Sequence, residues 1–266
     1  MATKVTRRFV ELPRATVHYA TAGEGDPVLL LHQTPRSWDE FREVLPILAK
    51  KRRVLAMDTV GFGDSSALPT DENSIEDWAE VVLSLLDELE LPSVHVVGHH
   101  TGAVIATRLA SSAPERVRSV VLSSAPFDDD DERAAQLNAK AIVDEVERSA
   151  DGSHVLELWQ IRAAFYPDDI RILERFTIDA LKAGDLAGAG HKIVASFDVP
   201  GAVTQIRCPI LLIGATDDPY AYPALARMRA ALPHASVEVI EGGMVPLPDQ
   251  MPEEFAGAVD RFLDRL

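Results

Sequence analysis

The sequence predicts an α/β fold, in which a mostly parallel sheet of eight strands is covered by helices on both faces. Two observations predict it. Apolar runs such as residues 27–31 and 53–57 do not alternate with polar residues, which is typical of strands covered on both sides. Between such runs lie stretches with the apolar spacing of a helix, so strands and helices alternate along the chain. Ligands of such sheets bind beyond the carboxyl ends of the strands.

The first third of the chain supplies one edge and part of the centre of this sheet. Residues 7–20 contain two short strand-like runs, which indicate an antiparallel hairpin at the edge. After the first buried run, helical spacing begins at Trp38, with Pro46 as an expected kink. A clearer helix should begin behind the capping residue Ser74 and end before Pro92.

The most informative stretch is the next strand and the helix that follows it. The apolar run 94–97 leads into Gly98-His99-His100-Thr101-Gly102, and a helical pattern then continues to Pro114. Glycines on either side of the turn permit a sharp backbone and a close approach of helix and strand. The spacing therefore places His100 at the apex of a strand-to-helix turn.

The second half of the chain contains a compositional break. A strand at 117–125 is followed by an acidic run, and residues 128–203 show helical patterns but no strand, which indicates a helical insertion after the sixth strand. Strands resume at 209–214 and 237–240, and a last amphipathic helix begins behind Pro252. We expect three segments: a first core part, 1–127; a helical cap, 128–203; and a second core part, 204–266.

Composition limits the function classes. The 266 residues are 47% apolar and carry a net charge of −16, which opposes binding to nucleic acid and to anionic membranes. No apolar run approaches the length of a membrane span, and no signal peptide is evident, so a cytoplasmic protein is expected. The one cysteine, Cys208, cannot form an internal disulfide. A small molecule is the expected partner of a monomer or homodimer.

With these motifs in view, the chain resembles the α/β-hydrolase superfamily, in particular its cap-bearing small-molecule hydrolases. The resemblance rests on four motifs: His32-Gln33-Thr34-Pro35 for the oxyanion loop H-G-x-P, residues 58–65 for D-x-x-G-x-G-x-S, residues 98–102 for the nucleophile elbow, and Gly214-Ala215-Thr216-Asp217 for the turn that carries the acid. It implies an α/β-hydrolase fold whose cap covers the pocket. It also implies that the backbone N–H groups of Thr34 and Thr101 bind an oxyanion, and that Asp217 is the catalytic acid.

The chain departs from this family at two catalytic positions. His100 stands where the family has its serine or aspartate nucleophile, and Met244 stands where it has its histidine. No histidine follows His234, so a small shift in alignment does not restore the base. A hydroxyl nucleophile needs an adjacent base, and an acyl-serine mechanism is therefore not expected. Gln33 also replaces a glycine of the oxyanion loop.

The candidate site therefore centres on His100. Its imidazole, oriented by Asp217, is expected to act as a general base; Asp218 and Asp128 remain alternative acids, and a packed histidine in an inactive site remains an alternative role. Substrate contacts are expected from five residues: Gln33, Thr34, Trp38, Thr101 and Met244. His99 and His32 are expected to be structural. The histidines lack the spacing of a known zinc site, and no metal or cofactor is expected.

Three functions stay open at this stage. The first is a hydrolase that acts on a small carbonyl compound, such as an ester or lactone, by noncovalent acid-base chemistry. The second is a cofactor-free lyase or isomerase that uses the same base. The third is a pseudo-hydrolase that binds a small apolar ligand or a protein partner without turnover. Consumption of a substrate separates the first two from the third.

Overall fold

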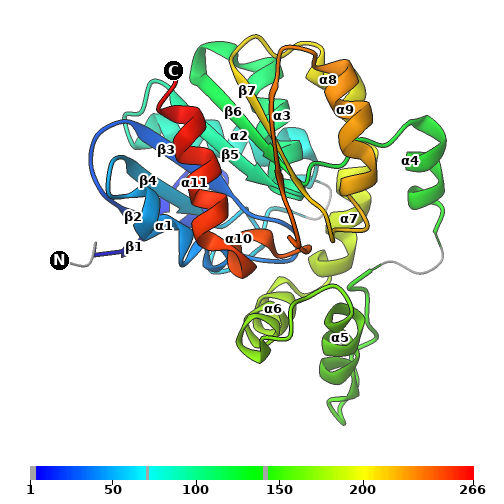
Figure 1. Cartoon of the computed structure of the whole chain (residues 1–266). Helices are drawn as coiled ribbons and strands as arrows, with labels where there is room; N and C mark the ends of the chain where they lie inside the picture. Colours follow the sequence, from blue (N-terminus) through cyan, green and yellow to red (C-terminus); the bar gives the residue numbers. More distant parts are fainter. Residues whose placement is uncertain (1–3, 70–71, 140–142) are drawn as a thin grey trace.

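The eight strands form one sheet in the computed structural model, which describes residues 4–69, 72–139 and 143–266. Their order across the sheet is β1-β2-β4-β3-β5-β6-β7-β8 (Figure 1). β1 pairs antiparallel with β2, and β2 with β4, while the other neighbours run parallel. The predicted fold class and edge hairpin are therefore confirmed. The strands are β1 Thr6–Glu11, β2 Thr16–Ala22, β3 Pro27–Leu31, β4 Arg53–Met57, β5 Val94–His99, β6 Val117–Ser123, β7 Ile210–Ala215 and β8 Ser236–Ile240.

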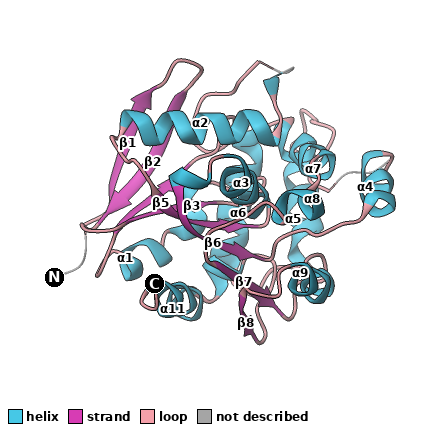
Figure 2. Ribbon diagram, turned by 90° about the horizontal axis from the view of Figure 1, so that it is seen from above, coloured by secondary structure: helices cyan, strands magenta, loops and turns pink. Residues whose placement is uncertain are grey.

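Helices cover both faces of this sheet, as Figure 2 shows. α2 (Ile75–Glu88) and α3 (Thr101–Ser112) pack on one face, and α1 (Val44–Leu48) and α11 (Pro252–Leu263) pack on the other. Successive residues of β3 divide between these two cores: Leu29 and Leu31 join the first, whereas Val28 and Leu30 join the second. Both faces of the strand are thus buried, which explains its continuous apolar run.

Two helices differ in detail from the expected pattern. The helix expected from Trp38 is a 3₁₀ turn, Trp38–Phe41, followed by the separate α1, whose third residue is Pro46. A proline ring fits the first turn of a helix because the amide it lacks has no intrahelical partner there. The sequence pattern of residues 222–232 likewise predicts one helix, which the structure divides into a 3₁₀ turn Tyr222–Ala224 and α9 Leu225–Ala231.

The described part of the chain between β6 and β7 contains five helices joined by loops and no strand. It contains α4 Asp130–Leu137, α5 Ser153–Ala163, α6 Ile170–Ala183, α7 Leu186–Ser196 and α8 Val199–Val203. α5 and α6 form a small apolar core of their own around Phe176, and they stand below the sheet in Figure 1. α7 and α8 instead contribute side chains such as Val203 to the core of the sheet. The cap boundaries at 128 and 203 therefore stay a prediction.

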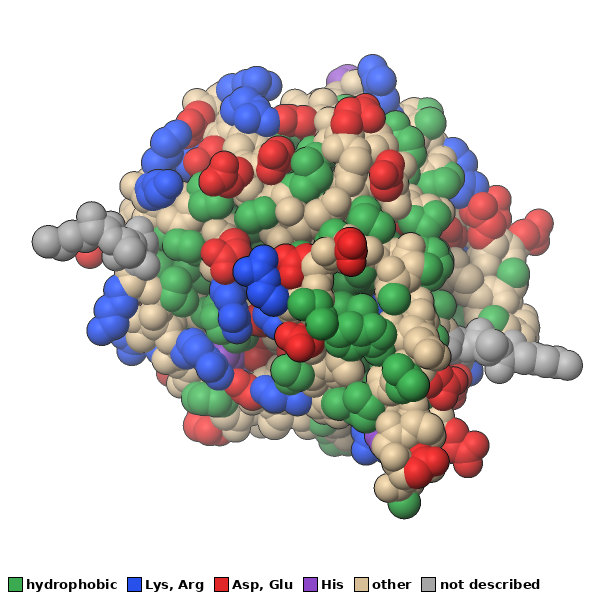
Figure 3. All heavy atoms as spheres, turned by 60° about the horizontal axis from the view of Figure 1, so that its bottom comes forward, with side chains coloured by type: hydrophobic (Ala, Val, Ile, Leu, Met, Phe, Trp, Pro, Cys, Tyr) green, Lys and Arg blue, Asp and Glu red, His purple; other side chains and the backbone are tan. Residues whose placement is uncertain are grey.

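The outer side of α5 and α6 is partly apolar. Figure 3 views this side of the molecule and shows apolar side chains gathered among charged ones. The exposed apolar residues of these helices are Val155, Leu156, Ile170, Ile178 and Leu181. None of the helices in the described ranges has the length and apolar character needed to cross a membrane.

A buried ionic cluster connects α6 to the core. Arg36, in the loop after β3, is fully buried; its Nε donates to Asp179 of α6 at 2.9 Å, and its Nη1 donates to Asp249 of α10 (Leu247–Gln250). Arg175 of α6 donates to Asp39 at 3.0 Å and to Asp249. Burial raises the pKa of Asp179 to about 6, although Arg36 opposes the shift. Each buried charge in this cluster depends on its partners, because an unpaired charge inside a protein is strongly destabilising.

The exchange Arg36→Ala tests this cluster. It leaves two buried carboxylates without their shared cation, and we expect the free energy of unfolding to fall by about 3–5 kcal/mol. The matched control is Arg42→Ala, which removes a half-exposed arginine that pairs with Asp39 and should cost about 1 kcal/mol or less. Urea unfolding measures both variants, and equal small losses would contradict a structural role for the cluster.

Candidate active site

A sharp turn joins β5 to α3 at His100. His100 has φ 47° and ψ −113°, in the positive-φ region that few residues other than glycine adopt. A Cβ atom on Gly98 would lie 2.2 Å from the carbonyl oxygen of Gly102, and one on Gly102 would lie 1.9 Å from the carbonyl oxygen of Leu31 in β3. Only glycine fits at these two positions, and the predicted strand-to-helix turn is present with His100 at its apex.

His100 faces a buried carboxylate across the end of the sheet. Its Nε2 lies 2.8 Å from Oδ2 of Asp218, whose side chain is fully buried. The contact lies away from the axis of an ideal N–H donor, so it is a short ion-pair contact and not an aligned hydrogen bond. The backbone N–H groups of Tyr220 and Ala221 donate to Oδ1 of Asp218 at 3.0 and 3.1 Å. Burial opposes ionisation of Asp218, but the charge of His100 outweighs it and holds the pKa of the carboxyl well below its usual range.

Asp218, and not the expected Asp217, is the aspartate beside His100. Asp217 is exposed, and its backbone N–H donates to the carbonyl of Gly243 at 2.8 Å. This bond fixes the turn after β7 so that the side chain of Asp217 contacts Thr216 at the surface, at 3.1 Å, and the side chain of Asp218 points inward. Asp217 is therefore not the partner of His100; the alternative, Asp218, is.

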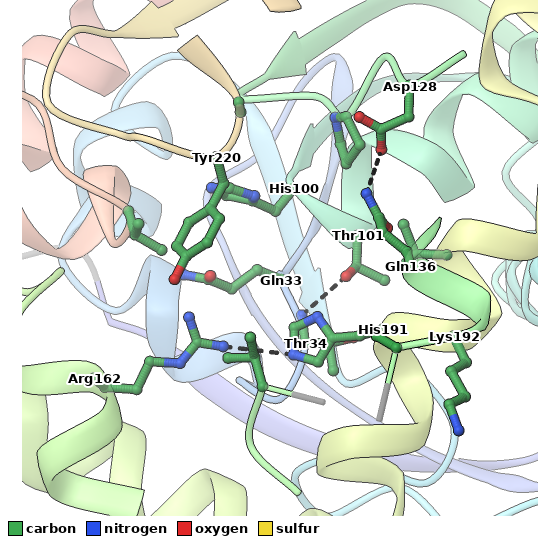
Figure 4. Close-up of a pocket in the computed structure, with 16 residues that line it drawn as sticks. Gln33, Thr34, His100, Thr101, Asp128, Gln136, Arg162, His191, Lys192 and Tyr220 are labelled. Carbon is green, nitrogen blue, oxygen red and sulfur yellow. Dashed lines mark hydrogen bonds between the residues drawn. The ribbon is translucent and has the colours of Figure 1, made fainter. Parts of the chain in front are cut away.

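A cavity of about 300 Å³ lies between the turn and the helical insertion. Figure 4 shows side chains of both parts around it. It is lined by Gln33, Thr34, His100, Thr101, Pro126, Asp128, Gln136, Ala139, Val143, Arg162, His191, Lys192, Val194, Tyr220, Ala221 and Val245. The structure thus brings together four of the predicted site residues, which are Gln33, Thr34, His100 and Thr101.

Two predicted pocket residues lie elsewhere. Trp38 packs toward the hairpin edge: its backbone N–H donates to Asp58 at 2.6 Å, and the guanidinium of Arg7 lies 5.7 Å from its ring centre. Met244 is half-buried, and its backbone N–H donates to Gln250 at 2.7 Å. Its neighbour Val245 lines the cavity instead. Neither Trp38 nor Met244 is among the residues that line the cavity, and their expected contact with a substrate stays a prediction.

In the loop of residues 32–35, which is expected to bind an oxyanion, one of the expected N–H donors already has a partner. The backbone N–H of Thr34 donates to Oγ1 of Thr101 at 3.2 Å, so this predicted oxyanion donor is already used. The hydroxyl proton of Thr101 remains to donate, together with its backbone N–H at the start of α3, where helix N–H groups lack intrahelical partners. Gln33 is held by the fully buried Glu40, which accepts from its backbone N–H at 2.9 Å. Burial raises the pKa of Glu40 to about 7.

The neighbouring histidines have structural hydrogen bonds. His99 Nε2 donates to the carbonyl of Val245 at 2.8 Å, so Nδ1 accepts from Ser123 at 3.0 Å. Burial and the charge of His100 lower the pKa of His99 to about 3. His32 Nε2 accepts from the backbone N–H of Thr59 at 2.9 Å, and its pKa is lowered, mainly by burial. Both residues are buried, which agrees with their expected roles.

One group of possible metal ligands lies outside the cavity. His18, Asp58 and Asp64 hold ligand atoms within 4.8 Å of one another. Asp64 is paired with Arg7 and Lys182, and the carboxylate of Asp58 accepts from the backbone N–H groups of Trp38 and Asp64 and contacts Nδ1 of His18. Arginine and lysine side chains and N–H groups thus already satisfy these oxygens, and the group does not resemble an open metal site.

The residues contributed by the insertion were missed from the sequence. Arg162 of α5 and His191 of α7 line the cavity, and Asp144, which precedes α5, contacts both of them. Helical spacing places Arg162 on a helix with Val155 and Leu158, but no motif in the sequence marked it, His191 or Asp144 as part of a site. The signal that was present, a cluster of helices inserted beside the turn, indicated that some insertion residues would face the site but not which ones.

Known proteins resemble this chain both in sequence and in structure. The sequence model of the family described as alpha/beta hydrolase fold matches residues 26–148. The enol-lactonase from Burkholderia xenovorans superposes with a TM-score of 0.77 at 21% identity, covering 97% of this chain and 100% of that chain. The chain has the α/β-hydrolase fold. The family model matches less than half of the chain, and the structural match shows the fold.

Curated relatives share either a short, more similar segment or the whole length at lower identity. The bifunctional epoxide hydrolase 2 of Sus scrofa is 38% identical over 117 residues, which are 43% of this chain and 21% of that protein. The chain therefore matches about a fifth of the length of that relative. The (E)-2-((N-methylformamido)methylene)succinate hydrolase of Acinetobacter baylyi is 22% identical over 255 residues, 94% of each chain.

The low pKa of His99 predicts how stability depends on pH. As the pH falls from about 6.5 toward about 3, the unfolded chain takes up a proton on this residue that the native protein does not. The native state then loses stability, by at most about 1.4 kcal/mol per pH unit. In His99→Gln, which has no titrating ring, this part of the slope should be absent. Urea unfolding at several pH values measures the difference, and parallel curves for the two proteins would show that His99 titrates normally.

Proposed function

We propose that the chain is a hydrolase of small carbonyl compounds, such as esters or lactones, in which His100 acts as a general base on water and no acyl-enzyme forms. The observation that carries the proposal is the contact of His100 with the buried Asp218, at the apex of the turn and on the wall of the cavity. A carboxylate in this position fixes the imidazole and stabilises its protonated form. The proposal requires no cofactor, and its partner is a small molecule bound to a monomer or homodimer.

The ring geometry assigns the two nitrogens of His100. Nε2 faces Asp218, so Nδ1 is the nitrogen left to accept a proton from a water molecule. That water attacks the carbonyl carbon, and the developing oxyanion accepts hydrogen bonds from the N–H and hydroxyl of Thr101. The bond to the leaving group then breaks, and the products are an acid and an alcohol, or a hydroxy acid from a lactone. The first step differs from a serine hydrolase only in that water replaces the enzyme hydroxyl.

The relatives support the reaction class. The Acinetobacter protein and the superposed enol-lactonase are both named for the cleavage of small carbonyl compounds. A cavity of about 300 Å³ is at the lower end of the usual size of small-molecule pockets. Its wall combines apolar residues such as Val194 and Val245 with the polar groups around His100, which suits a substrate that is small and partly polar.

Exchanging the two adjacent aspartates tests the dyad. Asp218→Asn removes the negative charge that orients and stabilises the imidazolium of His100, and we expect kcat/KM to fall by about 10²–10⁴-fold. Asp217→Asn is the matched control; its side chain is exposed, and it should change the rate by about threefold or less. Both rates are measured on an ester or lactone that the wild-type protein hydrolyses. A larger loss of rate in Asp217→Asn than in Asp218→Asn would show that Asp217, the residue at the acid position of the family, is the acid.

A second experiment separates the proposal from its alternatives. In H₂¹⁸O, direct hydrolysis places one ¹⁸O atom in the acid product, whereas a lyase or isomerase places none. Fluorophosphonate probes, which label activated serines, should not label the protein, because His100 occupies the apex of the turn. Mass spectrometry reads both results. Ligand binding without consumption, across an ester, lactone and epoxide panel, would favour the pseudo-hydrolase; stable labelling would contradict the noncovalent mechanism.

A further inference from the structure

A second histidine-aspartate pair faces the same cavity from the insertion. Nε2 of His191, on α7, lies 3.0 Å from Oδ2 of Asp144. His191 lines the cavity, and its side chain is 33% exposed, whereas the side chain of Asp144 is fully buried. The arrangement resembles that of His100 and Asp218, because in each pair a buried carboxylate lies close to Nε2 of an imidazole and leaves Nδ1 for the cavity; the His191 pair is hydrogen-bonded, whereas the His100 pair is an ion-pair contact.

Asp144 is fixed by contacts on its other side. Arg162 donates through Nε to Oδ1 at 2.8 Å and through Nη2 to Oδ2. Asp144 also has φ 66°, a backbone conformation that costs energy for a residue other than glycine and is common at functional sites. Burial opposes its ionisation, but the charge of Arg162 and the contact with His191 lower its pKa overall. Asp144 is therefore a rigid anion against which His191 can orient.

α7 packs closely against the loop of residues 32–35, which is expected to bind an oxyanion. A Cβ atom on Gly190 would lie 2.6 Å from Cγ2 of Thr34, so the helix approaches this loop as closely as a glycine permits. Thr34 in turn donates to Thr101. His191, which follows Gly190, is thus placed beside the loop that holds the expected oxyanion position. In Figure 4, His191 lies beside Thr34, on the side of the cavity away from Tyr220.

A purely structural role does not account for this position. The pair of Arg162 and Asp144 already satisfies both buried charges through its two-point contact, and it needs no histidine. The His191 side chain is one third exposed and lines the cavity, and its Nε2 also lies 3.5 Å from Nη2 of Arg162. With Nε2 held by Asp144, Nδ1 is the ring nitrogen left to contact a bound molecule.

We propose that His191 is a general acid that protonates the leaving group, and that His100 and His191 divide the proton transfers between the core and the insertion. This inference rests on the proposed hydrolase function. His100 takes a proton from water as its oxygen bonds to the carbonyl carbon. When the carbon–oxygen bond to the leaving group breaks, that oxygen takes the bonding electrons and receives the Nδ1 proton of the doubly protonated His191 ring, whose Nε2–H stays on Asp144. One imidazole has gained a proton and the other has lost one, and exchange with solvent restores both.

The chemistry identifies the substrate class. A nitrophenolate leaves without a proton, whereas an alkoxide is a strong base and needs a proton as the bond breaks. A dedicated acid is therefore useful for alkyl esters and for lactones, whose leaving group is an alkoxide. We infer that these, and not activated aryl esters, are the substrates for which the site is built.

A matched pair of substrates tests His191. We compare His191→Gln with wild type on p-nitrophenyl acetate and ethyl acetate, or on the aryl and alkyl esters of whichever acid the wild type accepts. Loss of the acid should lower kcat on the alkyl ester by about 10²–10⁴-fold and on the aryl ester by about threefold or less. The control is His154→Gln, a histidine on α5 that faces a separate hollow of the insertion and is absent from the cavity lining. Circular dichroism confirms that each variant is folded.

The outcomes are distinct. Equal losses on both esters, or none, in His191→Gln would overturn the assignment of the acid while leaving the hydrolase proposal intact. The rival donor is Asp128, a cavity residue whose carboxyl pKa is raised by burial; a leaving-group-selective loss in Asp128→Asn, with none in His191→Gln, would also overturn it. If the wild type hydrolyses no ester or lactone, the proposed function fails, and this inference fails with it. His100→Ala should lower the rates on both esters alike.

Discussion

The close approach of β3, β5 and α3 at the turn is the constraint on which the rest of the site depends. Gly98 and Gly102 leave no room for a Cβ atom, and the backbone between them must turn sharply enough to give His100 a φ of 47°. His100 is thereby placed just beyond the end of β5, between the sheet and α3. Because the neighbouring parallel strands end at the same edge, the loop that carries Thr34 and the loop that carries Asp218 meet it there.

The second constraint is electrostatic and joins the insertion to the core. Arg36 and Arg175 are held among three carboxylates at the junction, one of them on α6. Val245 adds an apolar contact, since it packs with the side chains of α5 and α6 and its carbonyl accepts from His99 beneath the site. Charged pairs need good geometry to offset the cost of burying them. The junction therefore specifies one position of α6 more strictly than apolar packing alone would.

The sequence predicted the fold and the turn because both depend on local patterns. Apolar runs, helical spacing and the two glycines each follow from backbone geometry within a few residues. The sequence predicted that Asp217 would contact His100, but Asp218 makes this contact. The choice between the two depends on a hydrogen bond from the backbone of Asp217 to Gly243, 26 positions away, which no local pattern reveals. The same limit applies to His191 and Asp144, which are 47 residues apart and meet only through the packing of the insertion.

The proposed mechanism connects two features of the sequence: a methionine at position 244 and a histidine at position 100. In a hydrolase with a serine at the turn, the base must come from a separate loop, because the short hydroxymethyl group cannot reach the acid. An imidazole at the turn spans that distance itself, and its Nε2 lies 2.8 Å from Asp218 without an intermediate residue. The loop that carries Met244 then needs to supply no base. Its backbone N–H at Met244 donates to Gln250, and Val245 lines the cavity. In the proposed hydrolysis, a water molecule takes the place of the serine as the nucleophile. His191 lines the same cavity from the insertion, and among the described residues of the cavity wall His100 is the one imidazole that the core contributes.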